Sequence, residues 1–225
     1  MTNTKIISGS EDGSIKIWDL ITNNTTKDLH HHASYVICLT KLNQRQIAIG
    51  GILKSIQIWD IIKMECLKII NGCSFTVSCI IKISSNKIAS GCVDGTIKIW
   101  EYNTDKCIKT LSDTYYINCI IKFSERILIS GSSGWTVKIY DILEGSCIKT
   151  LYGHNDQVNC VAKLNKNHIA SGSGGWSIRI WDVDSGGFLK TLSGHNGEVT
   201  CIAKLNQNQI VSGSNDCSFK IWDLF

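Results

Sequence analysis

The sequence predicts an all-β protein made of six copies of one four-stranded unit. Three observations support this prediction. The segment "IISGSEDGSIKIWDL" at residues 6–20 recurs five more times along the chain. The aromatic residue near the end of each copy returns after 40 or 41 residues. Short runs that alternate apolar and polar residues are separated by Gly, Ser, Asn and Asp, which is typical of short strands joined by tight turns.

The six copies follow one another without a linker. Their signatures occupy residues 6–20, 47–61, 88–102, 128–142, 169–183 and 210–224. The closing aromatic residues are Trp18, Trp59, Trp100, Tyr140, Trp181 and Trp222. Because no boundary fits between consecutive copies, we expect a single domain over residues 1–225.

The fifth copy illustrates the four strands in order. They are "VNCVAKL" from residue 158, "HIASG" from 168, "SIRIW" from 177 and "FLKTL" from 188. In the first copy the first strand is missing, because Met1 aligns with Leu205 at the end of a first strand of the last copy. The last copy stops after its third strand. We therefore expect about 22 strands, with incomplete first and last sheets.

A Gly-His pair at 153–154 and at 194–195, together with the closing Trp-Asp, resembles the WD-repeat (WD40) β-propeller family. The resemblance covers nearly the whole chain and implies a propeller with one blade per copy. In that family a hydrogen-bonded His, Ser, Asp and Trp hold each blade together. Only the last copy has all four, and the resemblance assigns this structural group to His195, Ser212, Asp216 and Trp222.

The other copies depart from this pattern. The third has Cys73 in the His position, and the fourth has Asp113 there and Gly134 in the Asp position. The fifth lacks only the Asp, which Gly175 replaces. His, Ser and Asp together also suggest a hydrolase triad. We nevertheless expect no catalysis, because the grouping repeats with a Trp and lies within packed sheets.

Two tryptophans occupy an unusual position. The fourth and fifth copies have Trp135 and Trp176 where the first and third have Gly13 and Gly95, the residue that a tight turn prefers. We expect these rings and nearby aromatic residues to form an arc that binds a protein: Trp135, Trp176, Tyr115, Tyr116, Phe75 and Tyr35. The alternative is that each tryptophan covers the gap left by the missing turn Asp.

Composition disfavours several other functions. The formal net charge is +4, but the only three arginines, Arg45, Arg126 and Arg179, are scattered, which argues against nucleic acid as a partner. No signal peptide or apolar membrane span is present, so we expect a soluble intracellular protein of the cytoplasm. The "HHH" at 30–32 has no zinc-type spacing around it, and we expect neither a metal nor a cofactor.

Eleven cysteines are present, and most occupy two repeated positions. Those on first strands are Cys38, Cys79, Cys119, Cys160 and Cys201, and those on fourth strands are Cys66, Cys107 and Cys147. Equivalent positions on successive sheets are too far apart for a disulfide. We therefore expect unbridged, buried thiols that serve packing.

The resemblance implies a non-catalytic protein–protein interaction scaffold that binds a peptide or protein on its upper face. One alternative is a structural subunit of a larger assembly whose incomplete sheets another chain completes; the open strand edges also allow a homo-oligomer. A second alternative is the substrate-receptor part of a ubiquitin ligase, because some relatives with similar "LKTLSGH" and "KIWDL" segments bind phosphopeptides through arginines. The scarcity of arginine counts against phosphopeptide binding here.

Overall fold

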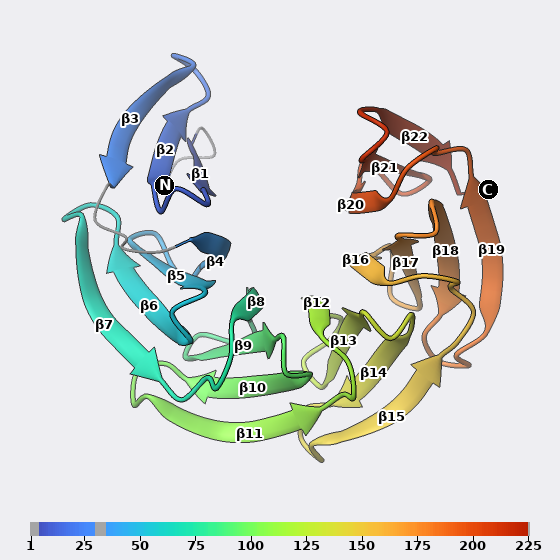
Figure 1. Cartoon of the computed structure of the whole chain (residues 1–225), viewed down its shortest axis with the longest axis horizontal. Helices are drawn as coiled ribbons and strands as arrows, with labels where there is room; N and C mark the ends of the chain where they lie inside the picture. Colours follow the sequence, from blue (N-terminus) through green and yellow to red (C-terminus); the bar gives the residue numbers. More distant parts are fainter. Residues whose placement is uncertain (1–4, 30–34, 225) are drawn as a thin grey trace. The chain divides into compact units, whose positions relative to one another are not determined.

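The computed structural model describes residues 5–29 and 35–224, and in these residues every regular element is a strand. Six sheets contain 22 strands, so the predicted all-β class and strand number are confirmed. Each sheet keeps its strands in chain order (Figure 1). The first and last sheets have three strands and the four between them have four, as predicted from the sequence.

The first sheet contains β1 (Lys5–Gly9), β2 (Ile15–Asp19) and β3 (Asn24–Leu29). The last sheet contains β20 (Val199–Lys204), β21 (Gln209–Ser214) and β22 (Phe219–Asp223). The second sheet contains β4 (Val36–Lys41), β5 (Gln46–Gly51), β6 (Ser55–Asp60) and β7 (Glu65–Asn71). The third contains β8 (Val77–Lys82), β9 (Lys87–Cys92), β10 (Thr96–Glu101) and β11 (Lys106–Ser112). The fourth contains β12 (Ile117–Lys122), β13 (Ile127–Ser132), β14 (Val137–Asp141) and β15 (Ser146–Leu151). The fifth contains β16 (Val158–Lys163), β17 (His168–Ser173), β18 (Ser177–Asp182) and β19 (Phe188–Ser193).

The chain divides into two compact units. Unit 1 comprises Met1–Asp94 and Lys98–Lys109, and unit 2 comprises Gly95–Ile97 and Thr110–Phe225. Unit 2 thus holds the fourth, fifth and sixth sheets complete. That residues 1–225 form a single domain stays a prediction.

Burial follows strand position within each sheet. The second strands of the complete sheets, such as β13 and β17, are buried at five of their six residues. The fourth strands, such as β19, are mostly exposed. In the incomplete sheets β1 and β22 have no buried residue, although at least half of the residues in each equivalent strand of the complete sheets are buried. The core therefore lies along the second and third strands.

Within each unit, neighbouring sheets pack closely where a glycine on a second strand accepts a valine from the next sheet. A Cβ atom on Gly131 would lie 2.5 Å from Cγ1 of Val158, and one on Gly50 would lie 2.6 Å from Cγ1 of Val77. Both distances are far below van der Waals contact. Only glycine allows this approach at these two positions.

Lysine side chains also link neighbouring sheets, because they donate to backbone carbonyls of an adjacent sheet. Lys163 Nζ donates to the Phe123 carbonyl at 2.5 Å, and Lys68 Nζ donates to the Asn103 carbonyl at 2.9 Å. The same arrangement recurs in the pairs Lys27–Ile62, Lys82–Leu42, Lys149–Asp184 and Lys204–Leu164. These six lysines therefore contact backbone carbonyls of a neighbouring sheet.

Candidate functional site

The loop before a first strand and the loop between the second and third strands lie at the same end of an antiparallel sheet. In unit 2 these loops are residues 113–116, 133–136, 152–157, 174–176, 194–198 and 215–218, which we call the upper loops. Backbone hydrogen bonds join the two loops of each sheet: Ser133 N to Tyr116 O (2.9 Å), Gly174 N to Gln157 O (2.8 Å) and Asn215 N to Glu198 O (2.9 Å). Each sheet of unit 2 therefore presents one connected pair of loops.

Trp135 and Trp176 hold the left-handed position of the turn between the second and third strands. Their φ angles are 65° and 66°, and the equivalent Gly13 and Gly95 both have φ of 81°. In Cys217 of the last sheet φ is 63°, so the turn geometry recurs whatever the residue. Bulky side chains disfavour this region of φ, which glycine adopts freely. Neither tryptophan is therefore explained by the needs of the turn.

The gap left by the missing turn carboxylate is filled by residues other than the tryptophans. At Gly134 a Cβ atom would lie 2.2 Å from Cδ2 of Tyr115, so the Tyr115 ring packs directly on this glycine. At Gly175 a Cβ atom would lie 1.9 Å from Oδ1 of Asn155. Other side chains thus occupy the space at both glycines.

All six predicted aromatic residues are exposed. The two tryptophans are 51% and 53% exposed, and the two tyrosines of loop 113–116 are 53% and 60% exposed. These four lie in the upper loops of unit 2, where Tyr115 packs beside the turn that carries Trp135. Tyr35 and Phe75 lie in unit 1. The predicted arc of six residues stays a prediction, because it would extend over both units.

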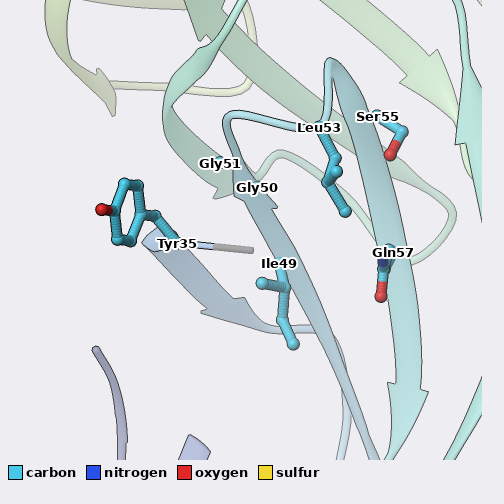
Figure 2. Close-up of a pocket in the computed structure, with 7 residues that line it drawn as sticks. All are labelled: Tyr35, Ile49, Gly50, Gly51, Leu53, Ser55 and Gln57. Carbon is cyan, nitrogen blue, oxygen red and sulfur yellow. The ribbon is translucent and has the colours of Figure 1, made fainter. Parts of the chain in front are cut away.

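Tyr35 lines a shallow hollow at the upper end of the second sheet. Figure 2 shows its ring before β4 and Leu53 in the turn between β5 and β6, with Gln57 on β6. The second sheet has Ile49 where the other sheets have a serine, which accepts from the closing tryptophan in the first, third, fifth and last sheets. Gln57 takes this role instead, because Trp59 Nε1 donates to its Oε1 atom at 2.9 Å. In unit 1 Phe75 lies beneath Lys54, whose Nζ atom is 5.7 Å from the ring centre.

The last sheet contains the complete hydrogen-bonded group. His195 Nδ1 lies 2.8 Å from Asp216 Oδ2, and its Nε2 lies 2.8 Å from Ser212 Oγ. Trp222 Nε1 also donates to Ser212 Oγ, at 2.8 Å. Hydrogen bonds from the Ser218 hydroxyl, the Asn196 amide and His195 hold the pKa of Asp216 far below its usual range. The His195, Ser212, Asp216 and Trp222 side chains are therefore joined to one another by hydrogen bonds within the last sheet.

The fifth sheet contains the same group without its carboxylate. His154 Nε2 lies 2.6 Å from Ser171 Oγ, which also accepts from Trp181 Nε1 at 2.7 Å. The buried Nδ1 atom of His154 has no hydrogen-bonding partner. Burial, with a further contribution from the charge of Arg179, lowers the pKa of His154 to about 4. Arg179 itself stacks on aromatic rings, 5.1 Å from the centre of Phe188.

The fourth sheet replaces the group by an ion pair that the sequence did not reveal. Asp113, in the His position, accepts from Lys138 Nζ at 2.8 Å, and the Asp113 side chain is fully buried. A basic residue recurs at this third-strand position, in Lys98, Lys138, Arg179 and Lys220. This recurrence identifies Lys138 as a candidate, but it does not reveal that Lys138 pairs with Asp113.

The upper loops of unit 2 carry four carboxylates and neither lysine nor arginine. Asp113 is paired with Lys138, and Asp216 contacts His195. In the described residues neither Asp156 nor Glu198 forms an ion pair. The exposed aromatic rings therefore share these loops with two carboxylates that form no ion pair in the described residues, which the sequence analysis had missed.

The expectation that the repeated cysteines are buried is partly wrong. All eleven cysteines are free, but Cys66, Cys107, Cys147, Cys201 and Cys217 are exposed. The fourth strand has little cover, so its thiols lie at the surface, where Cys147 Sγ lies 3.3 Å from the Lys149 carbonyl. Only Cys73 and Cys92 are fully buried. The thiols on first strands are half-buried, except for Cys201.

The described residues contain no group of three or more His, Cys, Asp or Glu that could hold a metal ion. The histidines at 30–32 lie outside the described residues. None of the described elements is a helix long and apolar enough to cross a membrane.

The model of the WD domain, G-beta repeat family matches residues 2–19, 64–101, 105–141, 145–182 and 186–223. The second copy is unmatched between residues 20 and 63, where Ile49 and Leu53 replace the serine and the turn carboxylate. No curated protein shows a significant match to the chain. The family consists of β-propeller proteins that generally act as protein-interaction scaffolds. Because the matched repeats cover well over half of the chain, this chain belongs to the WD40 repeat family.

Proposed function

We propose that this chain is a non-catalytic interaction scaffold that docks a peptide or protein on the upper loops of unit 2. Trp135 and Trp176 are the anchoring residues, and Tyr115 and Tyr116 extend the contact surface. Family membership supports the scaffold role, and the arrangement of these four rings supports the position of the site.

One observation carries the proposal. Both tryptophans are about half exposed in a backbone conformation that disfavours bulky residues. Tyr115 and Asn155 occupy the space that the tryptophans would cover under the alternative interpretation. A bulky residue that is exposed and held in a strained backbone conformation contributes little to the stability of the fold. Trp and Tyr are enriched among interface residues whose truncation costs about 2 kcal/mol or more, so binding accounts for them better.

The test compares Trp135→Gly, Trp176→Gly with the native chain in stability and in partner recovery. Glycine removes both rings and relieves the left-handed backbone, so the melting temperature should stay unchanged or rise. Partners recovered by the native chain should be lost. Cys217→Gly is the matched control, because it alters the same turn position without removing a ring. Lower stability with unchanged partners would instead assign the tryptophans to packing.

A second candidate function is supported by the last sheet. Phe219 and Ile221 of β22 are 75% and 57% exposed, whereas the equivalent Ile178 and Ile180 of β18 are buried. In the described residues no strand pairs with the outer edge of β22. Such an edge can accept a strand from another chain, as in a structural subunit or homo-oligomer. Molar mass measured by light scattering across a concentration series tests self-association through this edge.

A further inference from the structure

We infer that the segment bound by the upper loops of unit 2 is basic, with a lysine or arginine side chain placed against a tryptophan ring and the carboxylates of Asp156 and Glu198. This inference rests on the proposed function and specifies the chemistry of the partner. It follows from the charges around the rings, from the position of each carboxylate and from the absence of cations over these rings.

Charge complementarity is the first argument. The upper loops of unit 2 contain no lysine or arginine, and two of their four carboxylates are already paired within the fold. Asp156 and Glu198 remain without a cation in the described residues. A cationic partner gains from these charges, while a phosphate-bearing partner is repelled by them. Phosphopeptide recognition is therefore disfavoured at this surface.

Asp156 lies beside the turn that carries Trp176. Its carboxylate atoms are 3.0 to 3.3 Å from where a Cβ atom of Gly174 would lie, two residues before the tryptophan. The Ser173 hydroxyl donates to the Asp156 carbonyl at 3.1 Å, which fixes the loop against this turn. A cation at the Trp176 ring thus meets a carboxylate held close by.

Glu198 occupies the corresponding loop of the last sheet. Its carboxylate accepts from Asn159 Nδ2 at a distance of 3.5 Å, and its carbonyl accepts from Asn215. The side chain is half-buried and therefore restricted. The two carboxylates lie on adjoining sheets, since β16 contacts β20, and an extended basic segment can meet both.

The tryptophan rings carry no cation of the protein itself. Elsewhere the chain places cations over aromatic rings, as with Lys163 at 4.7 Å from the Phe123 ring centre. None of the cation–π contacts in the described ranges involves Trp135 or Trp176. Tryptophan is the aromatic side chain best suited to bind a cation. These two rings remain available for one.

The probe is a phage-displayed library of random heptapeptides, selected on the full chain, with enriched sequences synthesised for affinity measurement. We expect enrichment of peptides that combine lysine or arginine with apolar residues. Asp156→Asn, Glu198→Gln should raise their Kd about threefold to tenfold and weaken its dependence on salt. Glu125→Gln, Glu144→Gln is the control, because it removes the same charge from exposed residues outside the upper loops and should leave Kd unchanged.

The outcomes separate this inference from the proposed function. Peptides that bind Trp135→Gly, Trp176→Gly as tightly as the native chain, or a selection that enriches nothing, would contradict both. Peptides that need the tryptophans but lack lysine and arginine would overturn the inference and leave the proposed function standing. Unchanged affinity in the carboxylate variant, or selection of acidic or phosphorylated sequences in a matched library, would also overturn it.

Discussion

The Nδ1 atom of His195 lies 2.8 Å from Oδ2 of Asp216, whereas the same atom of the equivalent His154 is buried without a partner. Both histidines contact a serine that also accepts from a tryptophan. The hydrogen-bonded groups of the fifth and sixth sheets therefore differ by one carboxylate, because the fifth sheet has Gly175 in the position of Asp216. This pair of sheets makes the contribution of the carboxylate measurable within one protein.

Gly175→Asp should stabilise the chain by about 1 kcal/mol, because the buried Nδ1 atom of His154 gains a partner. The Asn155 side chain must rotate away, since its Oδ1 atom occupies the Cβ position. Urea unfolding measures the change. Gly175→Ala is the control, because it adds the Cβ atom without an acceptor and should not stabilise. Equal stability of the two variants would refute the role assigned to the carboxylate.

The stability of the native chain should fall as the pH drops from about 6.5 to about 4. Burial lowers the pKa of His154 to about 4, so the unfolded chain binds a proton first and is favoured within this window. The loss reaches at most about 3 kcal/mol. His154→Gln should lack this component. We would abandon the assignment if unfolding free energies of both proteins showed the same pH profile.

Asp113→Ala should destabilise the chain by about 3 kcal/mol, because it leaves the largely buried ammonium of Lys138 without its counter-charge. Asp113→Ala, Lys138→Met should recover part of this loss by removing the stranded charge. Denaturant unfolding of both variants and of Lys138→Met alone completes a double-mutant cycle. Strictly additive losses would show that the two residues do not interact.

Thiol titration should distinguish the cysteine classes. In the native chain we expect fast reaction at no more than the five exposed cysteines, and all eleven should react in denaturant without reductant. Burial raises the pKa of Cys79 and Cys160 to about 12, which keeps these two as unreactive thiols. Fewer than eleven thiols in denaturant would reveal a disulfide.

The strands could be predicted because each copy repeats the same alternation of residues at the same spacing. The turn position of Trp135 and Trp176 was predictable for the same reason. The surroundings of these rings were not predictable. Tyr115 packs on Gly134 only because the two loops of one sheet meet, a contact that no local pattern encodes.

The ion pair and the exposed thiols were missed for related reasons. The sequence shows Asp113 in a histidine position, but its partner Lys138 lies 25 residues away on a third strand. The cysteines on fourth strands lie in the same alternating pattern of apolar and polar residues as cysteines on buried strands. They are nevertheless at the surface, because the fourth strands form the exposed edge of the four-stranded sheets. Tertiary contacts determine which side chains pair and which strands are buried. The spacing of the repeats specifies only where the strands lie in the sequence.

The most direct test of the binding surface is site-specific photocrosslinking. A benzophenone amino acid replaces Trp176 in one variant and Leu143, which is 66% exposed and lies outside the upper loops, in another. Both are irradiated with an enriched heptapeptide or a recovered partner. The proposal predicts a crosslinked product from position 176 and none from position 143. Crosslinking from position 143 alone, or from neither position when binding is saturated, would contradict docking on the upper loops of unit 2.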